Sequence, residues 1–425
     1  MDGTDDEEDS NQFINIRNQA SLSLAGNFVD AGISFLGLVL FANVLGADGL
    51  GKFYVVLAVV KVCLFPIAGI GQSVMKRGSE RDLSPAVFFG GGLVYGFAYA
   101  ILVGVVVATI ALVDSTLLQY SSEVVIGAFA VFVSRIFYML LLDTYRSHGQ
   151  TGFATLTDNA HGIVETGIQV IFLLAGFGVT GLLAGTALTT IGASVILFGI
   201  SRVEIARPSL NTLRSISKFA RWSVLSSGLA TTYDRLPVLV LGFVLGNNVA
   251  GYYTSAMRLL MIGSYVGGAI GPALMVRASA SSTDRPDKSN LSDLSTSMQY
   301  TAILSIPIMF GSFAIPDALM TTVFGQSFVG TGSILIGLSI YHVINTYDTV
   351  LYSFFDGINH PEYSSKSTLY SLLFRIGLIY VSIDQFGAMG IVSSVVISHL
   401  FHLLAGQFFL IKKFNQTTFP RAVVT

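Results

Sequence analysis

Five basic side chains lie in the middle of long apolar stretches of this 425-residue chain. A charge at the centre of a membrane helix costs on the order of 2.5–3.5 kcal/mol, so such a residue usually serves a function. Four of the five are arginines, whose planar guanidinium can donate two parallel hydrogen bonds to a phosphate group. The pattern predicts a binding site for a phosphate-bearing anion. The cations are Lys61, Arg135, Arg235, Arg258 and Arg375.

Acidic residues also lie deep inside the predicted apolar stretches. They are Asp30, Glu165, Asp234 and Asp348. In one interpretation they neutralise the cations and hold the helices together, for example Asp234 with Lys61. In the other, an acid binds and releases H⁺ or Na⁺, so that all four are candidates for ion coupling. Asp30 corresponds to Ala230 at the repeat offset described below, one helical turn before Asp234, and the two halves therefore place an acid on the same stripe.

Twelve apolar stretches can hold these residues in membrane-spanning helices, each near the ~20 residues that a crossing needs. The chain is 52% hydrophobic and 11% charged, whereas soluble domains carry about 25% charged residues. We therefore predict an all-α polytopic membrane protein. The expected spans are 18–44, 50–73, 85–113, 123–147, 152–176, 178–201, 219–245, 249–275, 297–317, 330–355, 361–383 and 386–411.

Charge in the loops predicts the orientation of these spans. The N-terminus and every second loop after it hold seventeen lysines and arginines, and the other loops hold only Lys52. Because basic loops stay on the cytoplasmic side, both termini are expected in the cytoplasm of a prokaryotic cell, with the protein in its plasma membrane.

An internal repeat organises the chain. Val44-Leu45-Gly46 returns as Val244-Leu245-Gly246, and Gly51 and Gly71 return as Gly251 and Gly271. Phe177-Gly178 is echoed by Phe386-Gly387. A duplicated, very apolar chain is typical of secondary transporters, with the substrate site at the interface of the repeats. The predicted parts are a cytoplasmic acidic tail at 1–17, a six-helix bundle at 18–201, a basic linker at 202–218, a second six-helix bundle at 219–411 and a cytoplasmic tail at 412–425.

Other chemistry finds little support. Cys63 is the single cysteine, so a disulfide within the chain and a cysteine-rich metal site are excluded. His399 and His402 share a helix face, but no third metal ligand accompanies them. No phosphate-cradling glycine loop with Lys-Ser/Thr occurs. We expect neither a metal nor a cofactor, no nucleic-acid partner, and function as a monomer among membrane lipids.

Three motifs resemble the polysaccharide-lipid flippases of the multidrug/oligosaccharidyl-lipid/polysaccharide exporter superfamily. They are Leu45-Gly46…Gly51-x-x-Tyr54, the Asp234-Arg235 pair followed by Gly246…Gly251-Tyr252-Tyr253…Arg258, and Lys218-Phe219-Ala220-Arg221. The resemblance covers nearly the whole chain. It implies two six-helix bundles arranged as a V, as in the multidrug exporters called MATE transporters. It also implies a cationic cavity for the phosphate and sugars of a polyprenyl- or dolichyl-linked glycan, with Asp234, Arg235 and Arg258 as cavity residues.

We therefore predict a flippase, not an enzyme, that moves a lipid-linked oligosaccharide from the inner to the outer leaflet by alternating access. Two alternatives remain open. One is an ion-coupled exporter of small organic cations on the same fold, which the five cations disfavour. The other is a membrane glycan polymerase or ligase, which the short outer loops disfavour because they leave no room for catalytic groups.

Overall fold

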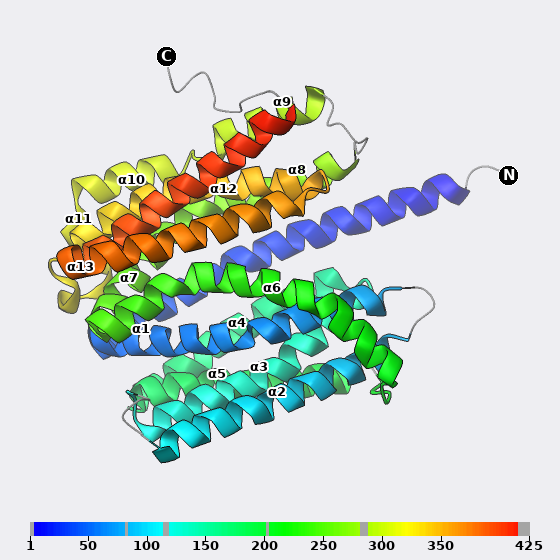
Figure 1. Ribbon diagram of the computed structural model, residues 1–425, viewed down its shortest axis with the longest axis horizontal. Helices are drawn as coiled ribbons and strands as arrows, with labels where there is room; N and C mark the ends of the chain where they lie inside the picture. Colours follow the sequence, from blue (N-terminus) through cyan, green and yellow to red (C-terminus); the bar gives the residue numbers. More distant parts are fainter. Residues whose placement is uncertain (1–3, 81–83, 114–118, 201–203, 281–287, 415–425) are drawn as a thin grey trace. The chain divides into compact units, whose positions relative to one another are not determined.

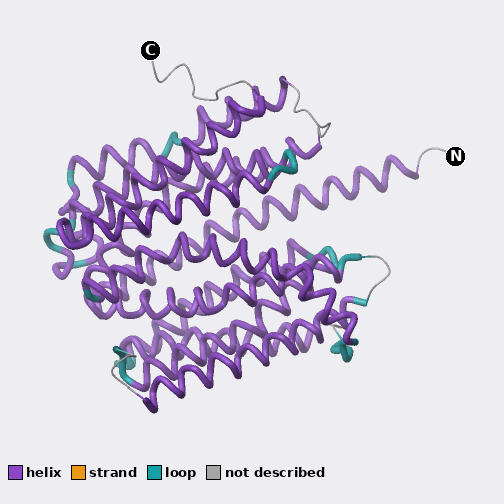
Figure 2. The backbone as a smooth tube through the Cα atoms, viewed as in Figure 1, coloured by secondary structure: helices purple, strands orange, loops and turns teal. Residues whose placement is uncertain are grey.

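The computed structural model describes residues 4–80, 84–113, 119–200, 204–280 and 288–414. Within these ranges every regular element is a helix (Figures 1 and 2). Such a fold follows from the composition, because only helices satisfy their own backbone groups in lipid while exposing apolar side chains. The all-α polytopic class predicted from the sequence is confirmed.

Two helices are too long for a single membrane crossing. The described apolar parts of α1 (Thr4–Gly78) and α13 (Pro361–Phe414) are each 53 residues, or about 80 Å at 1.5 Å per residue, against a bilayer core of about 30 Å. Each is interrupted by one glycine with non-helical backbone, Gly46 in α1 and Gly387 in α13. Each therefore contains two of the expected spans, joined by little more than this glycine. The acidic tail expected at 1–17 is helical from Thr4, and 415–425 of the C-terminal tail lies outside the described residues.

The other helices supply the remaining crossings. By length and composition, seven helices can cross a membrane, or up to nine when two bent pairs each count as one span. Nine spans become eleven when α1 and α13 each count as two crossings. The more polar helix α4 is the twelfth. The remaining elements are α2 (Pro85–Val113), α3 (Ser122–Ser147), α4 (Thr151–Leu174), α5 (Gly178–Ile200), α6 (Leu210–Val240), η2 (Leu241–Leu245), α7 (Asn247–Leu260), η3 (Met261–Ser264), α8 (Tyr265–Ala280), α9 (Lys288–Thr301), α10 (Ser305–Ala314), α11 (Pro316–Phe324), η4 (Gln326–Phe328) and α12 (Gly332–Gly357).

The ninth span begins earlier than its sequence suggested. Residues 276–296 were expected to form a long loop, but α8 continues to Ala280 and α9 starts at Lys288. The sequence of α9 is mostly polar, yet Leu291, Leu294 and Met298 recur at helical spacing and are all buried. They join a core with α8, α12 and α13. Tertiary packing therefore extends a helix that hydropathy alone would have ended.

The repeat is visible in the backbone. Gly46 and its counterpart Gly246 have positive φ angles of 67° and 104°. Gly178 and its counterpart Gly387 have φ angles of 58° and 51°. Residues with a Cβ rarely adopt this region, so both copies keep glycine where the chain breaks its helix.

The chain divides into two compact units. Unit 1 comprises Met1–Val44 and Val59–Gly228, and unit 2 comprises Leu45–Ala58 and Leu229–Thr425. The division expected from the sequence assigned all of 18–201 to one bundle, whereas here a short piece of α1 packs within unit 2. This piece of α1 packs closely against α7, and the close approach depends on the repeated glycines Gly51 and Gly251. A Cβ on Gly51 would overlap the carbonyl oxygen of Asn247, and a Cβ on Gly251 would overlap that of Ala47.

This contact predicts a strong penalty for Gly51→Ala. Because the added methyl meets backbone, which cannot swing aside, we expect the free energy of unfolding to fall by about 1–3 kcal/mol. Gly268→Ala in α8 is the matched control, since nothing lies within 4 Å of its Cβ position. Thermal unfolding in detergent measures both. Equal stability of the two variants would contradict the close contact.

Candidate functional site

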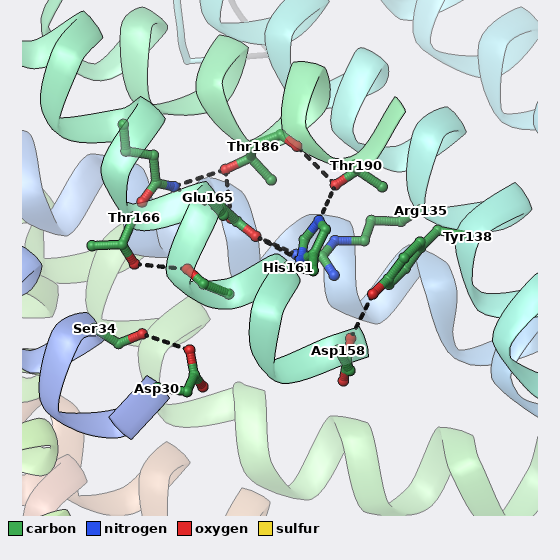
Figure 3. Close-up of polar contacts among 12 residues, drawn as sticks. Asp30, Ser34, Arg135, Tyr138, Asp158, His161, Glu165, Thr166, Thr186 and Thr190 are labelled. Carbon is green, nitrogen blue, oxygen red and sulfur yellow. Dashed lines mark hydrogen bonds and ion pairs between the residues drawn. The ribbon is translucent and has the colours of Figure 1, made fainter. Parts of the chain in front are cut away.

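Glu165 is the centre of a polar cluster in unit 1, formed by α3, α4 and α5 (Figure 3). Its Oε2 accepts a hydrogen bond from Arg135 Nη2 at 2.8 Å, and its Oε1 accepts one from Thr186 Oγ1 at 2.8 Å. Gln169 Nε2 lies 3.3 Å from the same Oε1. The Arg135 and Glu165 side chains are 27% and 15% exposed. Arg135, predicted to bind substrate, is thus paired with a predicted ion-coupling acid in this conformation.

His161 extends the cluster toward Asp158. Its Nδ1 lies 3.5 Å from Glu165 Oε2, and its Nε2 lies 3.1 Å from Thr190 Oγ1. The Thr190 hydroxyl donates to a backbone carbonyl in its own helix, so its oxygen can accept from His161. The His161 ring packs on Tyr138, with centroids 4.7 Å apart, and Tyr138 donates to Asp158 Oδ1 at 3.2 Å (Figure 3). Polar contacts and one ring contact therefore connect Glu165 to Asp158.

The sequence analysis did not single out several members of this cluster. His161, Glu165 and Gln169 recur every four residues along α4, and Thr186 and Thr190 do so along α5. Polar residues repeated at one helical turn inside apolar helices are a signal that two polar faces meet. This spacing could have identified the cluster before the structure.

Asp30 lies beside this cluster, where α1 crosses α4 (Figure 3). The crossing is close because Gly162 of α4 has no side chain, and a Cβ there would overlap Asp30 Oδ1. Ser34 Oγ donates to the same oxygen at 3.5 Å. Asn159, one turn before Gly162 on α4, bonds Asn27 of α1 at 2.8 Å. The half-buried Asp30 carboxylate is thus held against the helix that carries Asp158 and Glu165.

Unit 2 has its own polar cluster, centred on Arg375 of α13. This side chain is 1% exposed. Its Nε donates to Ser398 Oγ at 2.7 Å and its Nη2 to His399 Nδ1 at 2.6 Å, both in the second half of α13. Its Nη1 donates to the backbone carbonyl of Tyr233 in α6 at 2.7 Å. In this conformation the guanidinium is enclosed by protein, and is not presented to a ligand as the sequence analysis expected.

Asp348 and the two histidines complete the unit 2 cluster. Asp348 Oδ2 lies 3.1 Å from His402 Nδ1, and both residues are buried. The Tyr233 ring packs against His399 and His402, with centroids 5.1 and 5.8 Å apart. No group of three or more His, Cys, Asp or Glu that could hold a metal ion occurs in the described part of the chain.

The remaining candidates are more accessible. Asp234 and Lys61 are exposed, and Arg235 and Arg258 are half-buried. The guanidinium of Arg258 lies 5.8 Å from the ring centroid of Tyr54, both within unit 2. Arg258 belongs to the second copy of the repeated motif and Tyr54 to the first, so the structure brings the two copies together. Of the predicted cations, Lys61 and Arg135 belong to unit 1, and Arg235, Arg258 and Arg375 to unit 2.

The fold and its polar clusters define a class of polytopic transporters. A solved structure described as "Lipid II flippase MurJ, inward closed conformation" is similar, with a TM-score of 0.76, 15% identity, and coverage of 93% of this chain and 89% of that one. An inward-facing multidrug resistance MATE family transporter of the MOP superfamily has a TM-score of 0.69 at 17% identity, covering 91% of this chain and 96% of that one. Both similarities show the twelve-span MATE-like fold.

The family within this class follows from the sequence comparisons. Residues 40–332 match the family described as polysaccharide biosynthesis protein, and the chain belongs to this family. Two relatives come from Haloferax volcanii. The probable low-salt glycan biosynthesis flippase Agl15 is 23% identical, with 88% of this chain and 78% of Agl15 covered. The probable flippase AglR is 24% identical, with 89% and 80% covered.

The Arg135–Glu165 pair predicts non-additive mutations. Removal of one partner leaves the other charge uncompensated in a mostly buried place, whereas removal of both leaves none. We expect Arg135→Gln and Glu165→Gln each to destabilise the protein, and the double variant to lose about 0.5–3 kcal/mol less than the sum. Thermal unfolding of the three variants measures this coupling.

The ion pair of Arg277 with Asp293 is the matched control, with the same charges but an Arg277 side chain that is 74% exposed. Its coupling is expected at about 0–1 kcal/mol. Additive effects at Arg135 and Glu165 would show that these two side chains do not depend on each other.

Proposed function

We propose that this protein is a flippase that moves a lipid-linked oligosaccharide, carried on a polyprenyl or dolichyl phosphate, from the inner to the outer leaflet by alternating access. The glycan would serve surface polysaccharide or glycoprotein assembly. The observation that carries the proposal is the similarity along most of the chain to a protein named as a probable low-salt glycan biosynthesis flippase and to another named as a probable flippase. The protein is a multi-pass transporter and not an enzyme.

The phosphate supplies the chemistry that the basic residues fit. Lys61 and Arg135 in unit 1, and Arg235 and Arg258 in unit 2, place positive charge inside apolar helices, where an anionic headgroup lacks water and needs donors. The pairing of Arg135 with Glu165 keeps that charge compensated until a phosphate takes the place of the carboxylate. The role of Arg375 is different and is treated below.

An interior-negative membrane potential favours this direction of transport. Outward movement of an anion gains about 2.3 kcal/mol per charge per 100 mV across the full field. We place the protein in a prokaryotic plasma membrane with both termini in the cytoplasm, because loops rich in lysine and arginine alternate with loops that hold only Lys52. A monomer is sufficient for this mechanism, since the repeat already supplies two halves.

Loss of the accessible arginines tests the proposal. In a strain that lacks the gene, lipid-linked glycan should accumulate on the inner leaflet and surface glycan should disappear. Arg258→Gln and Arg235→Gln should each transport at least about tenfold more slowly, because a hydrogen bond to a charged group is worth about 1.5–3 kcal/mol.

Lys366→Gln, at an exposed position of α13, is the matched control and should restore surface glycan fully. Protein abundance in the membrane is measured for every variant. Normal flipping by both arginine variants would show that Arg235 and Arg258 do not form the phosphate-binding site. Product formation by the purified protein without leaflet movement would favour a polymerase or ligase, and growth protection against cationic dyes would favour an exporter of organic cations.

We further propose that Asp30 couples transport to H⁺ or Na⁺, either during outward movement or during the return of the empty carrier. Its carboxylate is half-buried and lies against α4 beside the cluster of Glu165, His161 and Asp158. A proton or Na⁺ bound there would change the charge at the crossing of α1 and α4. Asp234 and Asp348 are the corresponding candidates in unit 2.

Asp30→Asn should abolish the dependence of transport on the H⁺ or Na⁺ gradient, because the amide is isosteric but carries no charge. Flipping is measured in proteoliposomes under imposed pH and Na⁺ gradients. Asp48→Asn, at an exposed acid after the Gly46 break, is the control and should keep the dependence. If Asp30→Asn and Asp234→Asn both leave the rate and its ion dependence unchanged, the coupling proposal is wrong.

A further inference from the structure

Pro237 creates a problem inside α6. Proline has no backbone N–H, so it cannot donate to the carbonyl of the residue four positions earlier. In α6 that carbonyl belongs to Tyr233, which is buried. A buried carbonyl without a donor costs about 1–3 kcal/mol, and membrane helices tolerate an internal proline when a neighbouring group supplies the missing bond.

Arg375 supplies this bond. Its Nη1 donates to the Tyr233 carbonyl at 2.7 Å, and its guanidinium carbon lies 3.6 Å from the centroid of the Tyr233 ring. The same guanidinium donates to Ser398 and His399, which follow the Gly387 break in α13. One side chain therefore joins α6 to both halves of α13.

The position of this contact matters because of the residues that follow Tyr233. Asp234 and Arg235 come next in the chain, before Pro237. The five-residue helix η2 and the break at Gly246 follow Pro237. Without the N–H at 237, the intrahelical bonding that would hold this turn is incomplete. The bond from Arg375 replaces it, and so fixes the turn that carries the exposed Asp234 and the half-buried Arg235.

We propose that Arg375 is a positioning residue: it donates to the carbonyl that Pro237 leaves without a helical partner and so holds the Asp234-Arg235 turn of α6 in place for the ligand. The substrate's phosphate meets Arg235, and Arg375 acts on the substrate only through α6. Arginine suits this role since its planar fork reaches a carbonyl, a hydroxyl and an imidazole at once. Lysine has a single nitrogen and cannot reach all three.

A double-mutant cycle tests the bond without any assumption about transport. Ala at position 237 restores a backbone N–H for the Tyr233 carbonyl. The stability lost on Arg375→Gln should therefore be smaller in the Pro237→Ala background than in the wild type, by about tenfold in the unfolding equilibrium constant. Unfolding is followed in detergent by heat or by titration with dodecyl sulfate.

Pro272→Ala is the matched control, because Pro272 lies inside α8 of the same unit, whereas the hydrogen bonds of Arg375 described above join α6 and α13. The cost of Arg375→Gln should be unchanged in that background. Arg375→Lys is the second variant to be measured if Arg375→Gln does not fold, and its cost should likewise fall in the Pro237→Ala background. Equal costs of the Arg375 substitution in the wild type and in Pro237→Ala would overturn the proposal.

A transport measurement separates positioning from substrate binding, and this arm rests on the proposed function. Arg375→Gln should raise the KM for lipid-linked glycan, and Pro237→Ala should restore it in the double variant. Loss of transport in Arg375→Gln that Pro237→Ala does not relieve would assign Arg375 to the ligand instead. If the wild type flips no glycan, the proposed function fails, while the stability cycle still decides the role of Arg375.

Discussion

A polar group inside an apolar helix must find its partner within the protein, because lipid offers none. Most of the described interior of this chain can be understood from that constraint. Glu165 is matched by Arg135 and Thr186, and Arg375 by a carbonyl, a hydroxyl and an imidazole. Each match joins different helices or helix halves, so the groups that cost most to bury also determine how the helices pack.

The polar clusters of the two units are centred on side chains of opposite charge. The offset of 209 residues between Phe177 and Phe386 aligns Thr190 with His399, and Thr166 with Arg375. In unit 1 the cluster is organised around the carboxylate of Glu165, and in unit 2 around the guanidinium of Arg375. Each cluster nevertheless holds both signs, with Arg135 paired to Glu165 in unit 1 and Asp348 completing the cluster of Arg375 in unit 2. The two halves therefore differ in which charge lies at the centre of the cluster, and not in which charges they contain.

Hydropathy and charge predicted the twelve crossings, because insertion into lipid depends on each helix's own residues. They did not predict that two spans would follow each other in α1 with only Gly46 between them. This connection is made by the backbone conformation of one residue, which hydropathy does not report. They also missed the start of α9, where burial of Leu294 depends on other helices. Intramembrane charges were found by residue type, but their partners were not. Whether an arginine such as Arg375 faces a ligand or a carbonyl is decided by packing across 142 residues of sequence.

The segment Leu45–Ala58 belongs to unit 2 although the chain on both sides of it belongs to unit 1. The polypeptide therefore passes between the units at three places, none of which is the basic linker at 202–218. Chimeras that join the N-terminal half of one homologue to the C-terminal half of another at this linker would set Gly51 of one parent against Asn247 of the other. Recombination between relatives should succeed more often when Leu45–Ala58 and the C-terminal half come from the same parent. Functional recombinants in this family are therefore expected to have exchange points inside α1, at the ends of this segment.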